Sequence, residues 1–163
     1  MPIEHDVVEL ILADHRKMED LFREMRDVEG DREGALKTFA DLLIAHAEAE
    51  EGKVYPALKR FRDIPDDEVE HGVEEHTEGN EALLDLLEVK EVGSEEWDEK
   101  LEKLVEAVNH HAHEEESTIL NGARENVPDE RRAELGTAFM AERERRLAAG
   151  CGDPAYIRRL LGK

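Results

Sequence analysis

Apolar residues recur along this chain at alternating steps of three and four positions, the spacing that places side chains on one face of an α-helix. Four segments show such a stripe. The stripes consist of Val8, Ile11, His15, Met18, Phe22 and Met25; of Leu36, Phe39, Leu43, His46 and Glu50; of Val69, Val73, His76, Asn80, Leu83 and Leu87; and of Trp97, Leu101, Leu104, Val108, His111 and Glu115. No useful length of sequence alternates with the period of two that predicts a strand. The pattern therefore predicts an all-α protein with four amphipathic helices around one core.

Helix-breaking residues separate the four segments at 30–34, 64–67 and 92–94. Connections this short favour antiparallel neighbours, so the helices are predicted to run up, down, up, down as a four-helix bundle. Ser94 precedes the fourth segment and is predicted to cap that helix.

The chain continues beyond the fourth stripe with a weaker apolar pattern. It predicts an additional helix at about residues 128–149 that covers the bundle from outside, and a short helical turn within 153–163. A dimerising appendage is the alternative for both. The single cysteine, Cys151, stands between two glycines and is expected to be a surface thiol, with a redox role as the less common alternative. We divide the chain into a bundle at 1–125 and a helical extension at 126–163 that packs on it.

Each stripe holds one histidine near its middle, and two stripes add a glutamate four residues later on the same face. The six candidate metal ligands are His15, His46, Glu50, His76, His111 and Glu115. An uncompensated buried carboxylate costs several kcal/mol or more, so a cation is expected beside them. The other histidines, His5, His71, His110 and His113, fall off or beyond the stripes. His110 and His113 are expected at the surface, or as groups that orient a ligand.

A single histidine on an apolar stripe is more often a hydrogen-bonded core residue than a ligand. Pairs of histidine and glutamate four residues apart also arise easily where 40% of residues are charged. Four histidines and two glutamates in phase on four helices are much harder to explain in this way. The combined pattern therefore favours a metal site, although it assigns no catalytic residue.

The number and kind of these ligands favour some metals over others. Six inward groups exceed the four that a structural zinc ion needs. A ferritin-like carboxylate centre needs a Glu-x-x-His pair on each of two helices, whereas the one such pair here, Glu68 to His71, lies off its stripe. Two iron ions with histidine-rich ligation are therefore favoured, with manganese or a mixed pair as the alternative.

The order of these residues resembles that of the hemerythrin-like HHE cation-binding domains. His15, His46-x-x-x-Glu50, His76 and His111-x-x-x-Glu115 follow one another on separate segments, and Tyr55-Pro56 follows the first pair as it often does in that family. The resemblance covers about residues 5–122. It implies a four-helix bundle that holds a non-haem di-iron centre, with a shared oxo or hydroxo group between the irons.

Position 80 departs from the family pattern. Asn80 stands where oxygen-carrying hemerythrins have a histidine and many bacterial relatives have a glutamate. If Glu50 and Glu115 each bridge, every metal keeps an open position, which favours chemistry with an exogenous oxygen species over reversible O2 carriage. Asn80 is then a weak ligand or a hydrogen-bond donor to that species, and Gly72 and Gly79 are expected to make room for it.

The resemblance and the open positions imply a protein that reacts with small oxygen or nitrogen species. Our first hypothesis is a catalase-like disproportionation of hydrogen peroxide in defence against oxidative stress. The second is non-enzymatic binding or sensing of O2, NO or iron, so whether the chain is an enzyme is left open. Tyr55 is expected to have a packing role, with supply of a proton or an electron as the alternative.

Composition limits the other partners and the location. The net charge of -21 would repel nucleic acid and anionic membranes. No stretch approaches the roughly 20 apolar residues of a membrane span, and residues 1–4 lack the start of a secretory signal. We therefore expect a cytoplasmic monomer or homodimer with a diatomic or peroxide ligand and without nucleic-acid or membrane partners.

Overall fold

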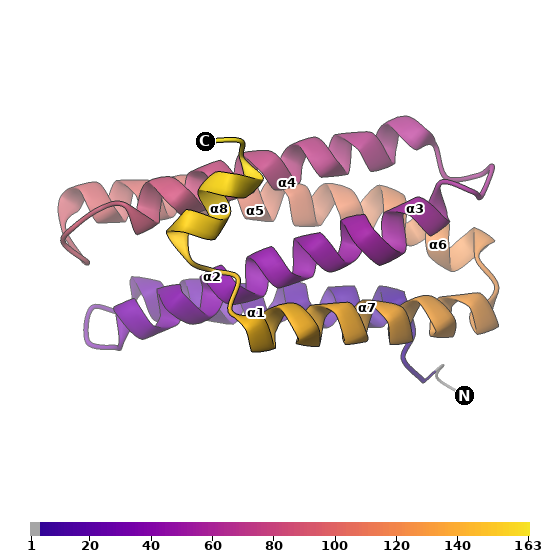
Figure 1. Cartoon of the computed structure of the whole chain (residues 1–163), viewed down its shortest axis with the longest axis horizontal. Helices are drawn as coiled ribbons and strands as arrows, with labels where there is room; N and C mark the ends of the chain where they lie inside the picture. Colours follow the sequence, from indigo (N-terminus) through magenta and orange to yellow (C-terminus); the bar gives the residue numbers. More distant parts are fainter. Residues whose placement is uncertain (1–3) are drawn as a thin grey trace.

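A computed structural model describes residues 4–163, and within that part of the chain every regular element is a helix. The four bundle helices are α1 (Val7–Arg26), α2 (Arg32–Ala49), α4 (Asp66–Leu87) and α5 (Glu95–Glu115). They lie side by side and antiparallel, with α1 packed on α2 and α4 packed on α5 (Figure 1). The prediction of an all-α, antiparallel four-helix bundle with an additional C-terminal helix is confirmed.

Side-chain caps begin three of these helices where the sequence changes from loop to apolar stripe. Asp6 Oδ1 accepts a hydrogen bond from Val8 N at 2.9 Å, and Asp31 Oδ1 accepts one from Gly34 N at 2.9 Å. Ser94 Oγ accepts from Trp97 N at 3.2 Å, as predicted. Each capping side chain accepts a hydrogen bond from a backbone N–H that has no partner within the helix. The capping residue therefore fixes the position at which the connection ends and the helix begins.

Two wide turns interrupt the second and fourth bundle helices, a feature that the sequence pattern did not predict. The π-helix η1 (Glu50–Val54) joins α2 to α3 (Tyr55–Leu58), and η2 (Glu116–Leu120) joins α5 to α6 (Asn121–Asn126). Segments of π-helix are rare and occur frequently at functional sites. Each begins at or directly after one of the two predicted glutamate ligands.

The apolar core consists of two separate clusters. One contains Phe22, Phe39 and Trp97, and the other contains Ile11 and Phe139. Along α1, α2 and α4, and along α5 with its continuation η2, the core positions change from one cluster to the other around the predicted histidine. The candidate ligands therefore form a polar layer between two apolar halves of the bundle.

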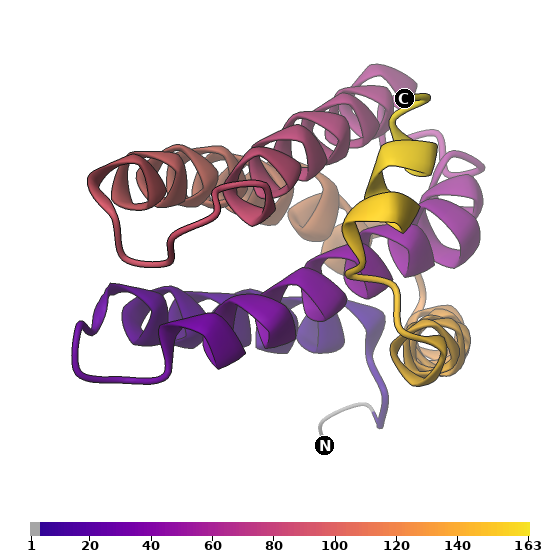
Figure 2. The ribbon, with the colours of Figure 1, turned by 60° about the vertical axis from the view of Figure 1, so that its left-hand side comes forward.

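The extension after the bundle forms two further helices, α7 (Asp129–Ala149) and α8 (Pro154–Leu160). Helix α7 packs against α1 and α2, and α8 crosses from the end of α7 to α4 (Figure 2). The close approach of α7 requires Gly136, because a Cβ atom there would lie 1.5 Å from His5 O. This arrangement agrees with an outer cover, while the division at residues 125 and 126 stays a prediction.

The expectation that Cys151 is a surface thiol was wrong. Its side chain is buried, and Sγ donates a hydrogen bond to Asp41 O at 3.2 Å. Burial raises the pKa of this thiol to about 11, which keeps it protonated and unreactive. The flanking Gly152 allows the chain to pass close to α2, since a Cβ atom there would lie 2.5 Å from Asp41 Oδ1.

In the described part of the chain, no helix combines the length and the apolar character that crossing a membrane requires.

Candidate metal centre

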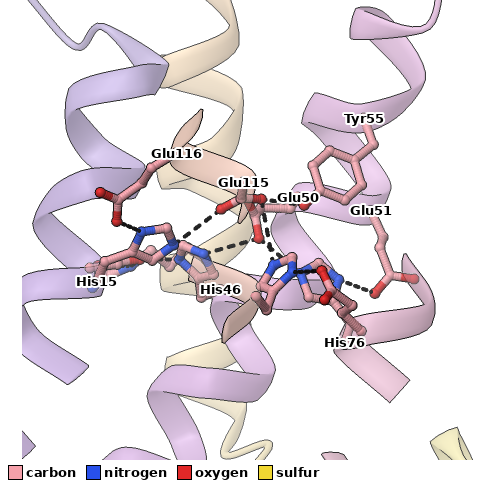
Figure 3. A network of polar contacts seen from close by, with 12 residues as sticks. His15, His46, Glu50, Glu51, Tyr55, His76, Glu115 and Glu116 are labelled. Carbon is pink, nitrogen blue, oxygen red and sulfur yellow. Dashed lines mark hydrogen bonds and ion pairs between the residues drawn. The ribbon is translucent and has the colours of Figure 1, made fainter. Parts of the chain in front are cut away.

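The four bundle helices bring all six predicted ligands into one buried layer. His15 comes from α1, His46 from α2, His76 from α4 and His111 from α5, while Glu50 begins η1 and Glu115 ends α5. Their exposure ranges from 0% for Glu50 to 8% for His111. Figure 3 shows the two carboxylates between the imidazoles. The phase of the stripes thus placed every candidate on the inner face, although their role as metal ligands stays a prediction.

Two groups of donor atoms share one carboxylate. Glu50, His76, His111 and Glu115 form one group, and His15, His46 and Glu115 form the other, with the donor atoms of each within 4.8 Å of one another. Glu115 Oε1 lies 3.1 Å from His15 Nε2, whereas Glu115 Oε2 lies 3.7 Å from His111 Nε2. This carboxylate therefore faces both groups.

Glu50 also lies between the two groups. Its Oε1 atom is 3.0 Å from His46 Nε2 and 3.1 Å from His76 Nε2. Each of these two glutamates thus contacts histidines from two different helices. The arrangement fits two cations held side by side, as the sequence pattern predicted.

Glu50 Oε2 and His111 Nε2 are buried in this layer without a hydrogen-bond partner. His46 Nε2 and Glu115 Oε1 each lie within ion-pair distance of one group but make no hydrogen bond of good geometry. Buried polar atoms are nearly always satisfied, so the orphaned atoms need another partner. Imidazole nitrogens and carboxylate oxygens suit divalent iron or manganese. The residues therefore fit a metal pair.

A second set of carboxylates lies beside Nδ1 of the four candidate histidines, the ring nitrogen that faces away from the centre. The Nδ1 atoms of the four imidazoles lie 2.7–3.1 Å from a carboxylate oxygen. The pairs are His15 with Glu116, His46 with Asp14, His76 with Glu51 and His111 with Glu75. We call Asp14, Glu51, Glu75 and Glu116 the outer carboxylates. An Nδ1–H donor fixed in this way leaves Nε2 free to face a metal.

The outer carboxylates connect the helices in a closed ring. Each one is adjacent in sequence to a candidate ligand, but it bonds the histidine of a neighbouring helix. The carboxylate on α1 bonds the histidine of α2, and the carboxylate on η1 bonds the histidine of α4. The carboxylate on α4 then bonds the histidine of α5, and the carboxylate on η2 bonds the histidine of α1. Sequence reasoning missed these four residues, and the signal was their position directly beside the ligands.

Helix α7 reaches this ring through Arg143. Its Nε lies 2.8 Å from Asp14 Oδ2 and its Nη2 lies 2.8 Å from Asp14 Oδ1, a two-pronged charged contact. Burial raises the pKa of Asp14, but the hydrogen bond to His46 and the Arg143 guanidinium outweigh that effect and lower it. Phe139 also packs edge-on to His46, with ring centroids 5.5 Å apart. The additional helix therefore helps to fix one candidate ligand.

Tyr55 contacts the centre from η1 and α3. Its hydroxyl donates a hydrogen bond to Glu115 Oε2, and its ring stacks on His76 with centroids 5.6 Å apart. Burial, together with the nearby Glu115, raises the pKa of Tyr55 well above its usual value, so it stays a donor. Gly72 gives this hydroxyl its space, because a Cβ atom there would lie 3.2 Å from it. Gly72 also lines a neighbouring cavity, so the expectation that it makes room for a small molecule stays a prediction.

A small cavity lies on the other side of the ligand layer. The four candidate histidines line it together with Gly79, Asn80, Val108 and several further side chains, and its volume is about 20 Å³. Asn80 is 9% exposed, and its Oδ1 atom has no hydrogen-bond partner. This space holds about one water-sized molecule.

This fold and site define a helical-bundle protein with a buried histidine and glutamate cluster. The chain belongs to the hemerythrin HHE cation-binding domain family, whose sequence profile matches residues 6–122. It is also 27% identical over 143 residues to a protein of Nostoc sp. strain PCC 7120 that is named DNA nickase. That match covers 86% of this chain and 40% of the length of the relative. No solved structure matches the chain.

Replacing Asp14 with alanine should weaken metal binding by about tenfold to a hundredfold, because outer carboxylates that orient metal-bound imidazoles contribute about that much to affinity. Asp14→Asn keeps an acceptor for His46 Nδ1 and should lose less. Affinity is measured on the full chain by competition with a chelator. Asp20→Ala removes an exposed carboxylate from the same helix and is the control. Equal affinities for Asp14→Ala and the wild type would contradict this role.

Metal-free protein should lose thermal stability as the pH rises. Burial lowers the pKa of His76, but hydrogen bonds to Glu50 and Glu51 outweigh it and raise the pKa from 6.5 to about 9. The protonated form therefore stabilises the fold fully below about pH 6.5, and this contribution disappears as the pH passes about 9.

Melting temperatures across this range test the prediction on metal-free and metal-loaded samples. The loaded protein should show a smaller decrease, because its imidazoles are already neutral ligands. Identical pH profiles for the two samples would show that the metal does not replace these protons.

Proposed function

We propose that this chain is a non-haem di-iron protein that reacts with small oxygen or nitrogen species, and that its activity is the disproportionation of hydrogen peroxide. The observation that carries the proposal is the small cavity beside the candidate ligands. Its volume of about 20 Å³ holds about one water-sized molecule, which favours a ligand of a few atoms over an organic substrate. The side of the cavity away from the histidines is apolar, with Met18, Leu43 and Val108, which favours a small neutral molecule.

The donor set supports two irons rather than one. Glu50 and Glu115 each face histidines from two helices, so each carboxylate could be shared by two cations. Two bound irons would supply the two electrons that pass from one peroxide molecule to the next. In the overall reaction, two molecules of hydrogen peroxide give one O2 and two molecules of water. A manganese pair is the alternative with the same electron count.

The surrounding residues position the reacting groups. Tyr55 donates to Glu115 Oε2 and so restrains that carboxylate on the side away from His15. Asn80 presents its side-chain amide to the cavity, where it can hydrogen-bond an oxygen atom of the substrate. The apolar wall excludes bulk water from the same space. These roles need no further cofactor.

The alternative is a non-enzymatic protein that binds or senses O2, NO or iron. The ring of outer carboxylates favours this alternative in one respect, since any movement of a ligand would pass to four helices and to α7 through Arg143. The same ligands and cavity serve both functions. Turnover of peroxide separates them.

We do not extend the named activity of the Nostoc relative to this chain. The match reaches only 40% of that protein, and a net charge of -21 repels a phosphodiester backbone. We propose a small-molecule ligand, no nucleic-acid or membrane partner, a cytoplasmic location, and a monomer or homodimer.

Iron-loaded protein should release O2 when hydrogen peroxide is added, as measured with an oxygen electrode. Asn80→Ala should lower the rate by about threefold to tenfold at unchanged iron content, because one hydrogen bond to the substrate is lost. Asn121→Ala, which changes an exposed amide on α6, is the matched control.

Two other results would contradict the enzymatic proposal. Two bound irons without O2 release would favour the binding or sensing alternative. Nicking of a supercoiled plasmid by the loaded protein, without peroxide turnover, would instead assign the activity for which the relative is named.

A further inference from the structure

A second group of histidines and glutamates lies on the outside of the bundle, between α4 and α5. His71 and Glu75 are four residues apart on α4, and His110 and Glu114 are four residues apart on α5. Each pair repeats the spacing of the buried ligands on a different face of its helix. We call these four residues the surface cluster. The sequence pattern places both of its histidines off the apolar stripes, with His110 expected at the surface or as a group that orients a ligand.

Distances within the surface cluster suit a shared cation. His71 Nε2 lies 3.2 Å from Glu114 Oε2 and 3.5 Å from Glu75 Oε2. Donor atoms of these three residues all lie within 4.8 Å of one another. His110 adds a second imidazole, with Nε2 3.1 Å from Glu75 Oε2 and 3.3 Å from Glu114 Oε1. Two imidazoles and two carboxylates match the donors that zinc, ferrous and manganous ions take in proteins.

Glu75 belongs to both the surface cluster and the ring of outer carboxylates. Its Oε1 atom lies 3.1 Å from His111 Nδ1, whereas its Oε2 atom faces His110 and His71. The residue is 5% exposed although its partner histidines are more than half exposed. One carboxylate thus separates the outside of the protein from a candidate ligand of the buried centre.

A cavity of about 180 Å³ is lined by residues of both the surface cluster and the buried centre. His71, Glu75 and Glu114 of the surface cluster line it, and so do the buried candidate ligands His111 and Glu115. His111 Nε2 is one of the orphaned atoms at the buried centre. A path lined by donors at both ends gives a cation new ligands before it loses the old ones, which lowers the cost of removing its water.

We propose that His71, Glu75, His110 and Glu114 form an additional metal site that captures a divalent transition ion and passes it to the buried centre. The transfer step rests on the proposed function, in that the buried residues bind metal. The capture step stands on the surface cluster alone. Glu75 connects the two steps, because it contacts the captured ion through one oxygen and orients His111 through the other.

The experiment is a zinc titration of the full-length, metal-free chain by calorimetry, followed by the time course of zinc uptake. Wild-type protein should bind three ions, and the double variant His71→Ala with His110→Ala should bind two. Uptake at the two buried positions should become at least tenfold slower in that variant and reach the same final level. His113→Ala, an exposed histidine on α5 outside the cluster, should behave as the wild type.

A second variant separates this proposal from the proposed function. His46→Ala with His111→Ala removes two buried ligands and should retain one zinc ion, at the surface cluster. Equal stoichiometry in the wild type and in His71→Ala with His110→Ala would overturn the additional site. Loss of one ion with unchanged uptake at the buried positions would overturn the transfer. The number of zinc ions bound and the rate of their uptake are measured independently of peroxide turnover.

Discussion

The burial of two carboxylates in the middle of an apolar bundle is the constraint on which the rest of this structure depends. Glu50 and Glu115 are 0% and 1% exposed, between two apolar clusters. Isolated carboxylates at such positions would become protonated or would unfold the bundle. Nearby imidazoles outweigh the effect of burial and lower the pKa of Glu50 well below its usual value. The charge is therefore retained, and the layer attracts cations.

The bundle and its site stabilise each other through the closed ring of outer carboxylates. Every bundle helix contributes a histidine to the centre, and that histidine is bonded to a carboxylate from a neighbouring helix or its π-helical continuation. Rotation of one helix would therefore change the orientation of the imidazole on the neighbouring helix. Arg143 adds α7 to this arrangement, which explains why a helix beyond the matched residues 6–122 packs so closely on α1 and α2.

The apolar stripes were enough to predict the bundle and the six inward residues, because burial and helical phase determine both. The stripes could not predict the outer carboxylates, because Asp14 and Glu75 look like ordinary polar neighbours until the helices are packed. The wide turns after Glu50 and Glu115 depend on tertiary contacts in the same way. Cys151 was misplaced since its burial comes from the return of the chain over Asp41, a contact between distant segments.

Mössbauer spectroscopy of protein loaded with isotopically enriched iron tests the central claim most directly, because coupling between two irons requires that they share ligands. Glu50 and Glu115 are the residues placed to be shared. We expect a spin-coupled ferric pair with a diamagnetic ground state. Independent paramagnetic ferric ions, or one iron per chain, would contradict it.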